Sequence, residues 1–436
     1  MKKYLLMLMF VAVFAFGLTS CNSDNDAATD GVIVVTIPHY KTAGNSGALY
    51  FLPIVESFNA RYEGRFRLNI EPMPQDMYAQ QLMLLAGQGM LPVLIEGGLD
   101  DEWFRSVIIP QNNFVDLRPH FTNQPVYRYL HPAAYAHNLT ADGRMITIPN
   151  PIQRPMTMFY NEALFQPSRP ISELSWAQVS AELGDNNISF MTSDNAWTTM
   201  LAFTSMIAEQ PGGAEILVNA VATQQGIMDF EQPPIIAALA TLQHVMQTHA
   251  QPNAIGANFD EAANAFFNLN SAMIANGPWM VGSLTSDPDG NWGPGFNPET
   301  IRSSVLPGNV ALFNPIGFNW WIPGTASPQE QELAVAFLQH MFSLQNLEFT
   351  MEIAGGLIPG FNYSQQFLSN RAADRLMDDY AGSLNANTII VPAFADTILS
   401  SMADMDFPSL LPLLVSGTHT PQQFAAALSQ AARDAS

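Results

Sequence analysis

Residues 31–38, GVIVVTIP, open the folded part of the chain and begin the alternation of elements that decides the fold. Their continuous apolar run predicts a buried strand. Residues 52–62, LPIVESFNARY, predict a helix with Pro53 near its first turn, where a missing N–H costs nothing. Residues 65–72, RFRLNIEP, alternate polar and apolar side chains and therefore predict a half-buried strand.

A second helix and a third strand continue this order. Residues 76–89 predict a helix that ends at glycines, and residues 91–98, LPVLIEGG, predict a short apolar strand. Strands that alternate with helices predict an α/β fold with a parallel sheet and right-handed crossovers. Because ligands gather at the carboxyl ends of such strands, residues 39–41 (HYK) and 96–103 (EGGLDDEW) are candidate site segments.

The N-terminus has the features of a secreted, lipid-anchored protein. Two lysines precede an apolar run over residues 4–18, which is the pattern of a signal peptide over residues 1–20. Residues 18–21, LTSC, resemble the lipobox of bacterial lipoproteins, which implies lipidation of Cys21, the chain's only cysteine. Residues 21–30 then form a polar leash with too few apolar groups to fold. The alternative is an ordinary secreted protein with a stray cysteine near its cleavage site.

Composition limits the classes of function. The formal net charge is −22, and removal of Lys2 and Lys3 with the signal peptide makes the mature chain −24, with Lys41 as its remaining lysine. This charge argues against binding nucleic acid. The chain contains no phosphate-binding glycine loop, no HExxH and no GxSxG motif, and its histidines and acidic residues predict neither a metal site nor a cofactor. After residue 30 about 400 residues remain, enough for two domains.

The middle and the C-terminal part of the chain are mainly helical. Residues 145–149 and 156–160 predict strands on either side of NPIQRP, a proline-rich segment that suits a crossing between domains. Clear helices follow at 175–184, 233–250 and 326–343; the first and the last are capped by Ser175 and Ser327. Residues 271–279 and 317–324 interrupt them as short apolar strands.

These segments, in order, resemble the extracellular solute-binding proteins of ABC importers, in the sugar-binding group that includes the maltose-binding protein. The most specific match is FFNLNSAMIANGPWM at 266–280, and LAGQGMLPVLIEGG, ITIPNPIQRPMTMFYNEALF, the helix start SWAQV, the segment from FNWWIPG and GGLIPG also correspond. Val93 departs from the family pattern, which often has Asp after the preceding proline, and the HYKTAGNSG loop differs as well.

The resemblance implies a two-lobe periplasmic-binding-protein fold of type II with a hinge. One lobe is expected to contain residues 31–150 and 276–320, and the other residues 151–275 and 321–436. It also implies a monomer that holds a carbohydrate between its lobes, performs no chemistry on it and delivers it to the permease subunits of an ABC importer. The expected location is the cell envelope, outside the cytoplasm, with the lipid on Cys21 in a membrane.

Sugars present apolar ring faces and hydroxyl groups, so a sugar site needs aromatic rings together with charged or amide groups. Trp320 and Trp321 are adjacent in a strand and point to opposite faces, so one of them is expected to be a ligand platform and the other to be buried. The full set of candidate ligand-binding residues is Tyr40, Lys41, Asp100, Trp197, Trp279, Trp320, Trp321 and Phe361.

Three alternatives remain open at this stage. A surface lipoprotein that degrades glycans could use acidic residues such as Asp100 and Asp101. A binding protein of the same class could take a peptide or a polyol phosphate, although the scarcity of basic residues argues against an anionic ligand. A receptor that serves a chemotaxis system or a sensor kinase would need no permease.

Overall fold

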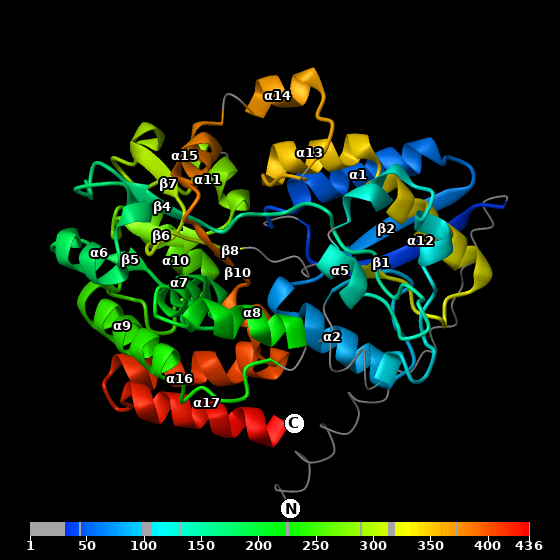
Figure 1. The fold of residues 1–436 in the computed structure, drawn as a ribbon. Coiled ribbons are helices and arrows are strands. Elements are labelled where there is room, and N and C mark those ends of the chain that lie inside the picture. The colour runs from blue at the N-terminus through cyan, green and yellow to red at the C-terminus, as the bar shows by residue number, and fades with distance from the viewer. Residues whose placement is uncertain are drawn as a thin grey trace, which may run out of the picture.

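The computed structural model of the chain describes residues 31–42, 45–97, 107–130, 132–223, 226–287, 290–312, 319–358, 360–371 and 374–435. Within these ranges the chain forms two α/β lobes with separate hydrophobic cores (Figure 1). The predicted two-lobe architecture is confirmed. The signal peptide, the leash with Cys21, and Asp100 lie outside the described residues.

The first lobe is built from the N-terminal part of the chain and a later segment that returns to it. Its elements are β1 (Ile33–His39), α1 (Ala48–Arg61), β2 (Phe66–Pro72), α2 (Gln75–Gly87), β3 (Ile95–Glu96), α4 (Arg118–Phe121), a 3-10 turn (Pro125–Tyr129), α5 (Pro132–His137), β9 (Trp320–Trp321), α12 (Pro328–Met341), α13 (Leu344–Ala354) and α14 (Gln365–Arg371).

The parallel pairing predicted for the first two strands is confirmed, with Ile33 opposite Phe66 and His39 opposite Pro72. β1 is buried on one face only, since Val35 and Ile37 are buried while Val34 is exposed. The predicted third strand differs from the expectation. Within the described residues β3 pairs antiparallel with β9, because the chain returning from the second lobe supplies its partner.

Helix α1 begins earlier than the sequence predicts. It starts at Ala48, so Pro53 lies inside the helix rather than in its first turn. A proline at this depth removes one backbone hydrogen bond. Burial of one face of α1, including Phe51, Ile54 and Phe58, stabilises the helix in spite of this loss.

The second lobe surrounds a four-stranded sheet with the order β5–β6–β4–β7. Its elements are β4 (Thr157–Asn161), α6 (Trp176–Leu183), β5 (Ile188–Ser189), α7 (Trp197–Ala208), α8 (Gly213–Thr223), α9 (Pro233–His249), α10 (Phe259–Phe267), β6 (Met273–Asn276), a 3-10 turn η4 (Pro278–Met280), α11 (Val281–Thr285), β7 (Ile301–Ser304), β8 (Val310–Leu312), α15 (Arg375–Ser383), β10 (Ile389–Val391), α16 (Phe407–Val415) and α17 (Pro421–Ala435).

Two predicted helix starts are confirmed in atomic detail. The Ser175 hydroxyl accepts a hydrogen bond from the backbone N–H of Gln178, whose side chain accepts one from the backbone of Ser175. Ser327 and Glu330 form the same reciprocal pair at the start of α12. Such capping boxes satisfy backbone N–H groups that have no partner inside the helix. No helix within the described ranges is both long and apolar enough to cross a membrane.

The division of the chain between the lobes differs from the expected one. Residues 276–304 stay in the second lobe, because β6 and β7 both pair with β4. Residues 322–367 belong to the first lobe, since Ile322, α12 and α13 share its core. The chain then crosses a third time between α14 and α15, which Figure 1 shows at the top of the molecule, and α15 packs against β7.

Candidate functional site

Glu96, at the end of β3, is the centre of a buried charged cluster at the carboxyl end of β1. Lys41 Nζ donates to both carboxylate oxygens of Glu96 at 2.5 Å, and His39 Nε2 lies 3.1 Å from Oε2. None of the three side chains is more than 9% exposed. The candidate Lys41 is therefore neither a solvated loop charge nor a free cation but half of a buried ion pair.

The protonation of this cluster follows from its surroundings. Burial alone raises the pKa of Glu96, but the charge of Lys41 and the hydrogen bond from His39 outweigh it and lower the pKa to about 2. Burial lowers the pKa of His39, which favours the neutral ring. The backbone N–H of Lys41 donates to His39 Nδ1 at 3.0 Å, so the ring proton sits on Nε2 and faces Glu96.

Aromatic rings enclose the cluster. The His39 ring stacks on Phe51, Tyr40 and Trp320, with centroids 4.4, 4.8 and 5.3 Å away. Tyr40 is 8% exposed, and its hydroxyl lies 3.5 Å from Glu96 Oε2. These contacts exclude water from the ion pair and strengthen it.

Trp320 and Trp321 point into different clusters, as two adjacent strand residues must, but both are buried. Pairing of β9 with β3 places Trp320 against Phe51 and Trp321 beside Ile95. Their exposed fractions are 1% and 0%, so the platform expected from one of them is absent from this structure. Phe361 is also a packing residue here, with its ring 5.0 Å from those of Tyr129 and Tyr363.

Arg154 lies beside the charged cluster, on the first crossing between the lobes. Its Nη2 is 3.5 Å from the hydroxyl of Tyr50, and its guanidinium lies 5.7 Å from the centre of that ring. Lys41 Nζ lies 5.3 Å from the same ring. Burial raises the pKa of Tyr50, but the positive charges of Lys41 and Arg154 outweigh burial and lower it. Two cations therefore lie close to the same tyrosine ring.

Neither Arg154 nor Glu96 was singled out from the sequence. Arg154 is the one charged residue in the crossing NPIQRP, a signal that could have identified it. Glu96 stood within the segment at the end of the third strand, and only the fold shows that it meets Lys41.

The first crossing, at 150–156, lies beside residues 355–358, which follow α13 within the first lobe. Gln153 and Leu357 exchange backbone hydrogen bonds of 2.8 and 2.9 Å. A Cβ placed on Gly356 would lie within 3.3 Å of Ile152 and Arg154. A Cβ on Gly355 would lie 2.5 Å from the ring of Pro278, so the end of α13 in the first lobe touches η4 in the second.

Three partly exposed aromatic rings form a cluster in the second lobe. The rings of Trp197 and Trp279, both predicted site residues, lie 5.4 Å apart, and Phe259 stacks on Trp197 at 5.7 Å. Trp279 folds back over Gly277, where any Cβ would lie 2.1 Å from the indole ring. This glycine allows the bend that presents Trp279. Phe259 had no distinguishing signal in the sequence.

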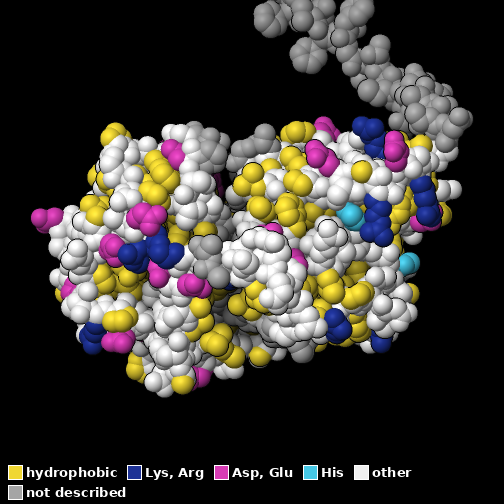
Figure 2. Space-filling view, turned by 90° about the horizontal axis from the view of Figure 1, so that it is seen from above, with side chains coloured by type: hydrophobic (Ala, Val, Ile, Leu, Met, Phe, Trp, Pro, Cys, Tyr) yellow, Lys and Arg dark blue, Asp and Glu magenta, His cyan; other side chains and the backbone are white. Residues whose placement is uncertain are grey.

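The aromatic cluster and the charged cluster lie on either side of one crossing. Trp279 adjoins Pro278, which touches Gly355. Gly356, the residue after Gly355, packs against Arg154. Figure 2, viewed from above, shows a furrow between the two halves of the molecule. Asn276, which ends β6 beside this crossing, has a buried side-chain nitrogen without a hydrogen-bond partner among the described residues.

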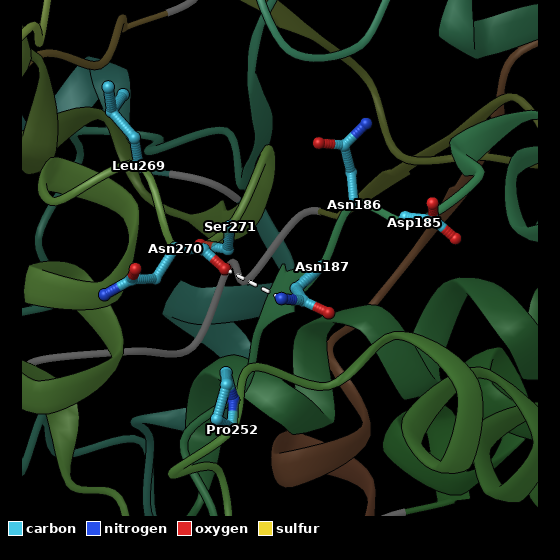
Figure 3. Close-up of a pocket in the computed structure, with 7 residues that line it drawn as sticks. All are labelled: Asp185, Asn186, Asn187, Pro252, Leu269, Asn270 and Ser271. Carbon is cyan, nitrogen blue, oxygen red and sulfur yellow. Dashed lines mark hydrogen bonds between the residues drawn. The ribbon is translucent and has the colours of Figure 1, made fainter.

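A small polar pocket elsewhere in the second lobe is a separate feature. Figure 3 shows its lining by Asp185, Asn186, Asn187, Pro252, Leu269, Asn270 and Ser271, where Asn187 donates to the backbone oxygen of Asn270 at 3.0 Å. These residues precede β5 and β6, so the pocket lies at the ends of those strands away from Trp279. In the described part of the chain, no three His, Cys, Asp or Glu side chains gather as a metal site.

The sequence profile of the bacterial extracellular solute-binding proteins matches residues 53–374, which span most of both lobes. The chain belongs to this family. An extracytoplasmic location follows from this membership. Comparison with curated protein sequences finds no significant match for this solute-binding protein.

Solved structures support the fold of this solute-binding protein. A chitin oligosaccharide binding protein superposes with a TM-score of 0.73 at 15% identity, over 93% of this chain and 99% of the other. A Streptococcus pneumoniae solute-binding protein, in complex with the blood group A-trisaccharide, gives 0.70 at 16% identity, over 92% and 100%. An ABC substrate-binding protein from Listeria monocytogenes, in complex with cycloalternan, gives 0.69 at 16% identity, over 93% and 99%.

Proposed function

We propose that this solute-binding protein captures a carbohydrate between its lobes and delivers it unchanged to the permease of an ABC importer. The observation that carries the proposal is the pairing of an aromatic cluster in one lobe with a buried charged cluster in the other, across a shared crossing. Trp197, Phe259 and Trp279 offer ring faces on which a sugar can stack. Tyr50 and Arg154 supply polar groups for its hydroxyls.

Hinge closure is the mechanism that this architecture favours. A ligand that touches both lobes binds the closed form more tightly than the open form, and it shifts the population by that difference in affinity. Three crossings join the lobes, and the bridge between Met156 and Leu312 ties the end of the first to the start of the second. Rotation about this tied pair requires few changes of backbone conformation.

The ligands named for the similar structures support a sugar as the class of ligand. They are a chitin oligosaccharide, a blood group trisaccharide and cycloalternan, all carbohydrates. At 15–16% identity these proteins show the fold alone, so the ligand class rests on the aromatic cluster.

Binding without chemistry is part of the proposal. A glycosidase pairs a carboxylate with a second, protonated carboxyl group beside the scissile bond. Glu96 cannot supply that proton because Lys41 and His39 keep its pKa near 2. A surface glycosidase remains the alternative, and the experiment below separates the two.

We further propose that the protein acts as a monomer held at a membrane by the lipid on Cys21. Two acyl chains on one cysteine give stable anchoring. Anchoring keeps the protein near the permease and raises its effective concentration there without any added contact.

A thermal-shift screen of the mature chain against mono- and oligosaccharides tests the function. A ligand at a hundredfold its dissociation constant should stabilise the fold by about 2.7 kcal/mol. Small-angle scattering with the best ligand should show a smaller radius of gyration, as closure requires. Steady release of hydrolysis products would overturn the binding function in favour of the glycosidase, and the absence of any stabilising sugar would overturn the carbohydrate assignment.

A further inference from the structure

Arg154 carries a positive charge that no described carboxylate pairs with directly, although Glu96 attracts it through space. Glu96 neutralises Lys41, and no described carboxylate forms an ion pair with Arg154. Its Nε is buried and lacks a hydrogen-bond partner among these residues. Its single polar contact in the described structure is the distant hydroxyl of Tyr50.

An arginine in this position costs free energy of folding unless a hydrogen-bonding or anionic partner contacts it. Arginine is rarely buried without a partner, and an unpaired polar group inside a protein costs free energy. Other arginines of this chain show the usual solution: Arg302 pairs with Glu162 at 2.6 Å and Arg144 with Asp142 at 2.9 Å. Arg154 differs from them because its position faces the crossing where a ligand is expected.

We propose that the ligand is an acidic sugar whose carboxylate pairs with Arg154 while its ring stacks on the aromatic cluster of Trp197, Phe259 and Trp279. This inference rests on the proposed function and narrows its ligand class. A planar guanidinium donates two parallel hydrogen bonds to a carboxylate, which a point charge such as lysine does not match. Arg154 as a whole residue is half-buried, although its Nε is inaccessible to solvent.

The overall negative charge of the protein bears on how it could bind an anionic ligand. The chain carries 38 acidic and 16 basic side chains, so its general field repels anions. An acidic sugar therefore needs a local positive charge, held where water is excluded. Arg154 supplies such a charge, and Lys41 does not because Glu96 neutralises it. The scarcity of basic residues in the sequence pointed to a neutral ligand. One half-buried arginine that has no carboxylate partner among the described residues points to an acidic one.

Matched ligands test the proposal on the unaltered protein. Trimers of galacturonate and of mannuronate are compared by calorimetry with their methyl esters, which keep the skeleton and lose the charge. At least one acid should bind ten times or more tighter than its ester. Its affinity should also fall with added salt, whereas that of the ester should not.

A variant then assigns the effect to one residue. Arg154→Gln should reduce the ratio of the affinity for the acid to that for its ester to threefold or less, because the acid loses its charged partner and the ester does not. Arg128→Gln is the matched control: Arg128 also lies over a tyrosine ring and donates to a tyrosine hydroxyl, but it does so on the exposed surface at Tyr129. This control should leave both affinities unchanged.

Each other outcome has a distinct meaning. If esters or other neutral sugars bind as tightly as the acids, the acidic-sugar assignment is overturned while carbohydrate binding stands. If neither acidic nor neutral sugars bind, both proposals fail. Tighter binding of galactose 6-phosphate than of either uronate would overturn the proposal that the charged group of the ligand is a carboxylate. Because the comparison of acid with ester uses the unaltered protein, it decides the question even if Arg154→Gln does not fold.

Discussion

Lys41 and Glu96 form an ion pair of 2.5 Å although they are 55 residues apart in the sequence, and both side chains are nearly inaccessible to solvent. This pair ties the loop after β1 to the end of β3 and therefore fixes one wall of the proposed site. Glu96 neutralises the ammonium charge and the pair is buried, so the pair supports the site rather than contacting the sugar.

Removal of the carboxylate charge should destabilise the first lobe. Glu96→Gln leaves the ammonium of Lys41 buried without a counter-ion, which costs about 3–5 kcal/mol. Chemical denaturation monitored by circular dichroism measures the loss. The exposed pair of Arg65 and Glu332 is the control, and Glu332→Gln should change stability little. Equal effects of the two variants would contradict the buried role of Glu96.

Acid should lower the free energy of unfolding over a pH range that is set by the pKa values of Glu96 and His39. The folded pKa of Glu96 is about 2, below its ordinary value of 4.5, so its contribution is complete above pH 4.5 and is lost as the pH falls toward 2. The lowered pKa of His39 acts in the same direction below pH 6.5. Denaturation curves at pH 7.5, 5.5 and 3.5 should show a progressive loss of stability. In Glu96→Gln, the additional loss between pH 4.5 and 2 should become smaller; an unchanged profile would argue against Glu96 as its source.

Trp279 should contribute directly to sugar affinity. Trp279→Ala removes a partly exposed ring from the aromatic cluster and should weaken binding about tenfold or more, as expected from the loss of a stacked face. Calorimetry with the best sugar from the screen measures the change. Trp292 lies in the same lobe, packs on Phe296 and is also partly exposed, which makes Trp292→Ala the matched control. Loss of affinity in the control alone would place the ligand elsewhere.

Gly355 should be sensitive because it touches the other lobe. A Cβ at this position would collide with Pro278 at 2.5 Å, and the backbone has a φ of +66°. Gly360→Ala is the control, since its φ of +72° is also in the left-handed range and no atom lies within 4 Å of the new Cβ. Gly355→Ala should lower the melting temperature and the sugar affinity more than Gly360→Ala does. Equal losses would mean that backbone strain, and not the contact between the lobes, is responsible.

Cys21 should determine attachment to the membrane. Cys21→Ser removes the thiol that would carry the lipid and should release the protein into the soluble fraction of a host that processes lipoproteins. Metabolic labelling with a tritiated fatty acid measures modification directly. Label in the variant, or soluble protein in the unaltered chain, would contradict the anchor. Sugar binding should be the same in both forms, because the leash precedes the folded lobes.

Local features of this fold were predictable from the sequence because they depend on residues close together in the chain. The caps at Ser175 and Ser327 use partners three positions away, and the buried face of α9 follows from helical spacing. The family resemblance placed Trp279 among the site candidates, Trp197 was a further candidate, and the structure brings their rings together.

The tertiary structure decided what depends on distant parts of the chain. Residues 319–322 return to pair with β3, and this pairing buries Trp320 and Trp321 and moves the boundaries between the lobes. The same packing joins Lys41 to Glu96 and leaves Arg154 beside Tyr50 without a carboxylate partner among the described residues. Spacing along a sequence sets which face of one element is apolar, whereas the partner of a buried charge depends on how separate elements meet, and no local pattern encodes that meeting.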